Sequence, residues 1–223
     1  MSRAGAGRRW ALLSLVALVA LAAFVAYAIR PPAWWVEQPA VGPEVEARAG
    51  HFEQACVSEL HRIRDGAEPW AVRIRESDVN AWLATRLDAW CRHVEIDPIG
   101  QIEVRFSSGR CEIAARIQGV PSVAVVPLAP VIRDDRLEPG LGSLRVGRLP
   151  VPFLVDAGVD ALIESFESED GEDLRAVLVP LLRGEGVPAK FGLVDGRTVR
   201  LRDIELRDDE LLLQFETLAK RPE

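Results

Sequence analysis

The sequence has few of the residues and motifs on which catalytic and metal sites depend. It contains three histidines and three cysteines, and none of the patterns CxxC, HExxH or GxSxG. Zinc ribbons, dithiol redox sites, zinc proteases and α/β-type serine hydrolases each require one of these patterns, because their reactive groups must lie at a fixed spacing. We therefore expect a protein that is not an enzyme and that holds no metal or cofactor.

The cysteine count limits the disulfides that the chain can form. Cys56, Cys91 and Cys111 are an odd number, so at least one thiol stays unpaired within the chain. In an oxidising compartment Cys56 can pair with Cys91, or Cys91 with Cys111. The alternative is that all three serve as small buried apolar side chains.

Calcium sites are not indicated either, although acidic residues are abundant. The clusters Asp134–Asp135, Glu167–Asp173 and Asp208–Glu210 lack the alternating Asp/Asn pattern of a calcium-binding loop. Each cluster coincides with a predicted turn, where Asp and Gly meet local backbone requirements. We interpret the three clusters as solvated turns.

What the sequence does contain is a long apolar run near its N-terminus. From Trp10 to Ile29, 20 consecutive residues carry no formal charge, and as a helix they span about 30 Å, the thickness of a bilayer core. Arg3, Arg8 and Arg9 precede the run, and cationic flanks stay in the cytoplasm. We expect one transmembrane helix in a bacterial inner (plasma) membrane, with a cytoplasmic N-terminus and the rest of the chain outside.

A cleaved signal peptide is the alternative to this anchor. Ala26-Tyr27-Ala28 has the small-x-small form that signal peptidase accepts. The apolar run is longer than the usual signal core of about 7 to 15 residues, which favours an uncleaved signal anchor. In both cases the rest of the protein is exported.

The exported part is strongly acidic. Residues 1–30 hold four of the 27 basic residues and none of the 34 acidic ones, so residues 31–223 carry 23 basic and 34 acidic residues, a net charge of −11. This charge argues against nucleic acid as a partner and against the binding of anionic lipid headgroups by charge alone. The predicted organisation is a basic cytoplasmic tail (1–9), a transmembrane helix (10–29), an extended proline-rich stalk (30–43) and one exported domain (44–223).

Hydrophobic periodicity predicts an α+β domain, with a curved antiparallel sheet packed on two or three amphipathic helices. Apolar spacings of three and four predict helices that begin near Pro43, at Ser77 as N-cap and after Pro152. Period-two alternation predicts a hairpin at 102–117 and a three-stranded meander at 191–215. We interpret residues 120–132, which are apolar but interrupted by three prolines, as a long, bent edge strand.

The middle of this proline-rich strand is apolar on both faces. In Val123–Val126 no residue is polar, whereas a strand of an antiparallel sheet usually turns one polar face to water. Its second face is therefore covered, either by helices as ordinary core or as part of an apolar groove that admits an acyl chain. The candidate groove residues are Trp82, Val123, Val125, Leu128, Val131, Leu149, Val151 and Leu154.

Two short phrases and the order of the segments resemble a known family. The phrases are Ser77–Leu83, which contains Asn-x-Trp-Leu, and Arg145–Pro152, which contains Gly-x-Leu-Pro-x-Pro. With the anchor, the hairpin, the proline-broken strand and the closing strand at 199–206, they are similar to the YpmS-like membrane-anchored bacterial proteins, which look like relatives of tubular lipid-binding (TULIP-like) domains. The resemblance implies a long helix wrapped by a curved antiparallel sheet, an apolar channel for lipid and no catalytic residues.

These observations predict a membrane-tethered lipid-binding or lipid-transfer domain of the cell envelope. Its expected partners are the membrane, through Trp10 to Ile29, and a lipid or another hydrophobic ligand. The alternative is an envelope assembly or scaffold module that binds a protein partner through the acidic face at Glu167–Asp173.

Overall fold

The computed structural model describes most of the chain in eight segments. These are residues 4–37, 41–62, 64, 69–93, 100–116, 122–151, 172–193 and 196–218. The helix expected after Pro152 lies outside the described residues, and so do the groove candidate Leu154 and most of the acidic segment Glu167–Asp173.

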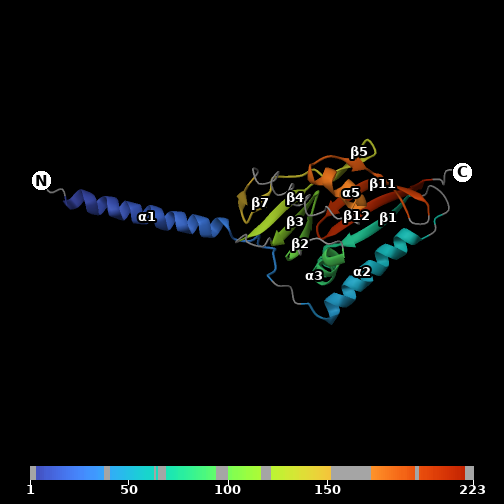
Figure 1. The fold of residues 1–223 in the computed structure, drawn as a ribbon, viewed down its shortest axis with the longest axis horizontal. Coiled ribbons are helices and arrows are strands. Elements are labelled where there is room, and N and C mark those ends of the chain that lie inside the picture. Colours follow the sequence, from blue (N-terminus) through green and yellow to red (C-terminus); the bar gives the residue numbers. More distant parts are fainter. Residues whose placement is uncertain are drawn as a thin grey trace.

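One long helix stands apart from the rest of the molecule. α1 (Ala4–Ala28) projects from one end of the folded body (Figure 1), and its side chains are described for Leu13 and for residues 15–28. Large apolar side chains remain exposed along it, including Leu18 at 63% and Phe24 at 57%. Over the residues that the structure describes, none of the helices combines the length and the hydropathy that a bilayer crossing requires.

The body is α+β, as the sequence predicts, and begins with a helix, a strand and a second helix. α2 (Pro43–His61) starts at the predicted proline, with Glu44 and Glu46 in its first turn. β1 (Pro69–Arg75), which we did not predict, runs directly into α3 (Glu76–His93).

The predicted N-cap of the second helix is wrong. Ser77 is already helical, because α3 begins at Glu76 directly after the last residue of β1. The Ser77 hydroxyl hydrogen bonds to the neighbouring Asp78 carboxylate at 3.4 Å. The Glu76 carboxylate instead accepts a hydrogen bond from the backbone N–H of Phe106 at 2.6 Å, which ties the start of the helix to a strand of the next sheet.

All strand pairs are antiparallel and form three sheets in the described part of the chain. The first sheet has the spatial order β1, β12 (Glu210–Leu218), β11 (Thr198–Arg207) and β10 (Lys190–Gly192). The second has the order β2 (Ile102–Ser107), β3 (Arg110–Arg116), β4 (Val123–Leu128), β7 (Arg145–Val146) and β8 (Leu149–Pro150). The third joins β5 (Val131–Arg133), β6 (Arg136–Glu138) and β9 (Val187–Pro188), with α5 (Glu172–Leu182) preceding β9.

These strands confirm the predicted hairpin and meander but correct the prediction for the proline-rich strand. β4 is a central strand, paired with β3 on one side and β7 on the other, and not an edge strand. Its proline, Pro127, lies near the end of the strand, where the opposite neighbour is an irregular segment and the N–H of Gly142 donates to the Pro127 carbonyl at 2.8 Å. The predicted turn at Asp134–Asp135 is present, with both residues at positive φ.

The main core lies between the second sheet and the first, with α3 at its side. Val104, Phe106 and Cys111 from β2 and β3 pack with Leu206 of β11, and Val79 and Leu83 of α3 close the cluster. A second cluster lies on the first sheet, where the Trp70 and Phe215 rings stack at 4.6 Å. These contacts are built from the apolar faces of alternating strands.

No disulfide joins the three cysteines, all of which are free. Cys91 is fully buried and Cys111 is 8% exposed, so they serve as small core side chains. Neither of the two proposed pairs, Cys56 with Cys91 or Cys91 with Cys111, is formed. Burial raises the pKa of the Cys111 thiol to about 12, with smaller contributions from the charges of Glu76 and Glu112, so this thiol stays protonated.

The segment after α1 is not a free stalk over its described part. Trp35 is 7% exposed and packs against Ala114, Val123 and Val125 on the outer face of the second sheet. The Trp34 indole N–H donates to Glu112 at 3.2 Å. Residues 31–37 are therefore part of the fold, and they cover the second apolar face of β4 that the sequence left unexplained.

Candidate functional site

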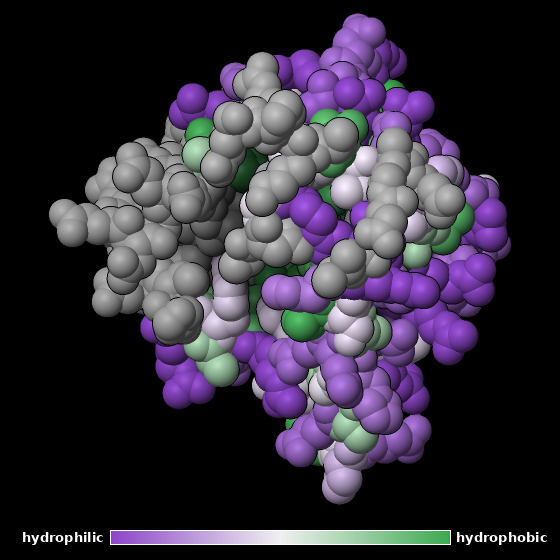
Figure 2. Space-filling model, turned by 90° about the vertical axis from the view of Figure 1, so that its right-hand side faces the viewer, coloured by the Kyte–Doolittle hydropathy of each residue, from purple (hydrophilic) through white to green (hydrophobic). Residues whose placement is uncertain are grey.

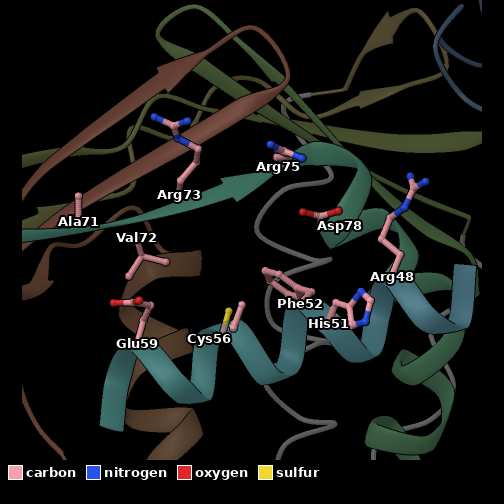
Figure 3. Close-up of a pocket in the computed structure, with 11 residues that line it drawn as sticks. Arg48, His51, Phe52, Cys56, Glu59, Ala71, Val72, Arg73, Arg75 and Asp78 are labelled. Atoms are coloured by element: carbon pink, nitrogen blue, oxygen red, sulfur yellow. The ribbon is translucent and has the colours of Figure 1, made fainter. Parts of the chain in front are cut away.

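The described surface contains a groove between α2 and the outer edge of β1. It has a volume of about 450 Å³ and is shown in Figure 3. This volume falls within the range of about 300 to 1,000 Å³ that is usual for small-molecule sites. The lining comes from α2, β1 and the first turn of α3: Arg48, His51, Phe52, Ala55, Cys56, Glu59, Ala71, Val72, Arg73, Arg75 and Asp78.

The groove exists because β1 is an edge strand. It pairs with β12 along its whole length, and no other described strand pairs with its outer edge. α2 runs alongside that edge instead (Figure 1). An edge strand presents unpaired backbone groups, and proteins protect such edges with short strands and charged side chains, so Arg73 and Arg75 have a structural reason to be there.

α2 is held in place by α3 and not by β1. The Trp82 indole N–H of α3 donates to the Glu53 carboxylate of α2 at 2.9 Å, and Arg86 forms an ion pair with the same carboxylate at 3.5 Å. Ala49, on the predicted apolar stripe of α2, is fully buried. Trp82, which we predicted as a groove residue, therefore fixes the helix that forms one wall of the groove.

The floor of the groove is apolar. Phe52 and Cys56 point from α2 toward β1, and Val72 points from β1 toward α2 (Figure 3). All three side chains are half-buried. Burial raises the pKa of the Cys56 thiol, so the thiol stays protonated at neutral pH and contributes apolar surface and not a nucleophile.

The rim of the groove carries an excess of positive charge. Arg48, Arg73 and Arg75 contribute three guanidinium groups, and the acidic lining residues are Glu59 and Asp78. Glu59 is already paired with Arg64 at 2.6 Å, outside the groove lining. The lining therefore has three arginines against two carboxylates, on a domain whose residues 31–223 carry a net charge of −11.

Two of the three rim arginines, Arg48 and Arg73, already form ion pairs. Arg48 contacts Glu44 at 3.3 Å, but the Glu44 side chain is 89% exposed, and such a helix-surface pair contributes little. Arg73 contacts Glu210 at 3.3 Å across the sheet. The groove therefore offers guanidinium donors above apolar surface, which suits a ligand with an anionic head and an apolar body.

The predicted groove residues of the second and third sheets do not form one surface. Val123 and Val125 are fully buried beneath Trp35, and Leu128 packs in the main core. Val131 in β5 and Leu149 in β8 are 42% and 37% exposed, and Val151 is half-buried. None of these residues lines the groove beside β1.

The residues that form this groove escaped the sequence interpretation for a specific reason. Trp70, Val72 and Ile74 alternate with Ala71, Arg73 and Arg75, which is the period-two pattern of a strand. We assigned no element to this stretch, which precedes the helix predicted at Ser77. The alternation was the signal that would have identified the edge strand and its two arginines.

Metal binding finds no support in the described part of the chain, where no group of three or more His, Cys, Asp or Glu side chains could share an ion.

No family model matches the sequence, and neither the curated proteins nor the solved structures contain a significant match to it.

Proposed function

We propose that the protein is a single-pass, membrane-tethered domain of the bacterial cell envelope that binds an anionic amphiphile without transforming it. The observation that carries this proposal is the groove between α2 and β1, with its apolar floor and basic rim. A membrane lipid with a phosphate or carboxylate head has the matching chemistry, because guanidinium groups recognise such oxygens and the floor accepts apolar groups.

The tether is supported by the apolar run and by the exposure of α1. All 20 residues from Trp10 to Ile29 are uncharged. Side chains such as Leu15, Val19 and Leu21 are 57% to 61% exposed on a helix that leads away from the body (Figure 1). Apolar surface of this extent is unfavourable in water and is expected where a bilayer or a protein covers it. The cytoplasmic N-terminus follows from the preceding arginines.

This proposal places the lipid site in the α2–β1 groove and not beside Val123 and Val125, where the sequence predicted it. A channel beneath Val123 and Val125 would have to displace Trp35, which fills that place. The α2–β1 groove needs no such displacement. The expected kinship with YpmS-like and tubular lipid-binding proteins remains a prediction.

The test is the lipid that copurifies with the full-length chain. We expect native mass spectrometry of the protein, released from detergent, to show one anionic lipid bound. Arg75→Glu should lose it, because the substitution places a carboxylate at the rim, whereas Arg110→Glu makes the same charge change at an exposed residue that begins β3, outside the groove, and should keep it. A wild-type protein that carries no lipid, or an Arg75→Glu protein that carries as much as the wild type, would contradict the proposal.

The same edge strand favours a second candidate function, a scaffold that binds an extended acidic peptide. An extended peptide can add to an exposed strand edge by backbone hydrogen bonds, with neighbouring side chains providing specificity. β1 presents such an edge beside a helix, and its arginines would select an acidic peptide. A photo-cross-linking residue in place of Ala71 separates the candidates in cells: a lipid adduct supports the first, and a specific protein adduct supports this scaffold function.

A further inference from the structure

The last turn of α1 is joined to the body by defined contacts. The Ser122 hydroxyl donates to the Ile29 carbonyl at 2.6 Å, and the backbone N–H of Arg148 donates to the Ala28 carbonyl at 2.8 Å. Arg148 belongs to the two-residue turn between β7 and β8. The end of the helix is thus attached to the residue before β4 and to the β7–β8 hairpin at the same point.

Gly147, the other residue of this turn, packs so closely against the end of α1 that no side chain fits between the hairpin and the helix. A Cβ added to Gly147 would lie 2.5 Å from the Ala28 carbonyl oxygen and 2.8 Å from the Ser122 hydroxyl, and Gly147 has a φ of +60°. Both the close approach and the positive φ require glycine. With Trp35 buried seven residues further on, the body has one defined orientation relative to α1.

This orientation brings the hairpin to the place where the chain leaves α1. Figure 1 shows β7 at the end of the body from which α1 projects. The Arg148 guanidinium lies over the Tyr27 ring, 4.4 Å from its centre. Arg148, Leu149 and Pro150 are all exposed there. A cation and an apolar side chain side by side match the layer in which lipid phosphates lie above the acyl chains.

The opposite end of the body has a different character. Figure 2 shows the end that faces away from α1, where most of the described surface is hydrophilic. A hydrophilic far end and an amphipathic near end are the arrangement expected of a body that lies against a bilayer on one side only.

We infer that the tip of the β7–β8 hairpin is a second contact with the membrane, in which Arg148 binds a lipid phosphate and Leu149 enters the headgroup layer beside α1. This inference rests on the proposed tether, and it is independent of the ligand in the α2–β1 groove. The protein then touches the bilayer at two places joined rigidly through Gly147, and the body does not swing freely at the end of a linker.

The experiment uses the full-length chain in nanodiscs of phosphatidylglycerol and phosphatidylethanolamine. A photo-cross-linking residue replaces Leu149 in one variant, Leu18 in the second and Val131 in the third. Val131 is as exposed as Leu149, at 42% against 37%, but lies on β5, away from α1 (Figure 1). We expect lipid adducts at positions 18 and 149 and none at position 131.

The outcomes separate this inference from the proposed tether. An adduct at position 18 without one at 149 overturns the hairpin contact and leaves the tether standing, whereas no adduct at position 18 overturns the tether itself. Equal adducts at 131 and 149 overturn the inference, since contact would then be nonspecific.

Substitution of Arg148 tests whether its positive charge contributes to the contact with lipid phosphate. Combined with the cross-linker at 149, Arg148→Glu should lower the adduct yield several-fold, because it replaces the phosphate-binding cation with an anion. Arg148→Lys should restore most of the yield. Thermal unfolding checks that both variants keep the joint, which uses the backbone N–H of Arg148 and also has its guanidinium over the Tyr27 ring. A yield that Arg148→Glu leaves unchanged contradicts the role of phosphate.

Discussion

Single residues carry the joint between α1 and the body, and Gly147 is the one least open to change. Gly147→Ala forces the Ala28 carbonyl away and places a side chain at positive φ, and each effect is unfavourable. We expect a loss of about 1 to 3 kcal/mol in the free energy of unfolding. Urea unfolding of the full chain in detergent, followed by tryptophan fluorescence, measures it.

A second glycine supplies the control for this substitution. Gly50 lies within α2, and an added Cβ there meets nothing within 4 Å. Gly50→Ala should therefore stabilise the protein by about 0.5 to 1 kcal/mol, because alanine favours a helix. If both substitutions change the stability in the same direction, the close packing at Gly147 is not what the structure describes.

The raised pKa of Glu76 leads to a prediction about how the stability of the protein depends on pH. Burial raises the pKa of Glu76, and the hydrogen bond from the N–H of Phe106 opposes this rise only in part. The folded state then holds this proton at a pH where the unfolded chain has already released it. The stability contributed by Glu76 is therefore present below the ordinary Glu pKa and falls as the pH rises through the raised value.

The measurement compares the wild type with Glu76→Gln, which keeps an acceptor for Phe106 but cannot ionise. Urea unfolding from about pH 4 to about pH 7 spans the titration of a carboxyl group with a raised pKa. We expect the stability of the Gln variant, relative to the wild type, to increase with pH. Glu185→Gln, at an exposed residue after α5, is the control. A relative stability that stays constant with pH would show that Glu76 does not titrate abnormally.

At the scale of elements, hydrophobic periodicity predicted the helices and strands that are specified by a single chain segment. The helix from Pro43, the hairpin at 102–117 and the closing meander were found because their apolar residues repeat at the period of a helix or a strand. The turns at Asp134–Asp135 and Asp208–Asp209 followed from residues that tolerate positive φ. Each of these features is decided by residues that are close together in the sequence.

The elements that sequence reasoning missed depend on distant partners. The proline content of β4 suggested an edge, but the position of a strand in a sheet is decided by its neighbours, and β7 lies some 20 residues further along the chain. The segment 31–37 has no period of its own, and its burial comes from a match between Trp35 and the outer face of β3 and β4. The groove likewise forms only where α2, β1 and the first turn of α3 come together, and none of these segments forms it alone.

The packing of residues 31–37 against the second sheet leads to a prediction about stability. Trp35→Ala removes a buried indole from the cluster of Ala114, Val123 and Val125 and should lower the free energy of unfolding by about 3 to 5 kcal/mol. The neighbouring Val36 is 56% exposed, and Val36→Ala should cost well under 1 kcal/mol. Chemical unfolding of both variants in detergent tests the difference. Similar small losses would mean that residues 31–37 are a linker after all.

At the scale of the whole molecule, the joint bears on how the chain is processed. The small-x-small sequence that ends at Ala28 is a signal-peptidase motif, yet Ala28 is 1% exposed, and its carbonyl is bound by Arg148. Cleavage after Ala28 would remove this acceptor and would leave Gly147 without the Ala28 carbonyl against which it packs. We therefore predict that signal peptidase does not cleave the chain after Ala28.

We therefore expect the protein purified from membranes to keep its first 28 residues and to show the full mass of 24.5 kDa. Intact-mass spectrometry with N-terminal sequencing decides this directly. A mature N-terminus at Ile29 would contradict the tether, the fixed joint and the hairpin contact together, because all three require α1 to stay covalently attached. The α2–β1 groove would be unaffected, since its lining comes from α2, β1 and α3 and not from α1, and a released domain of that kind could still carry its ligand away from the membrane.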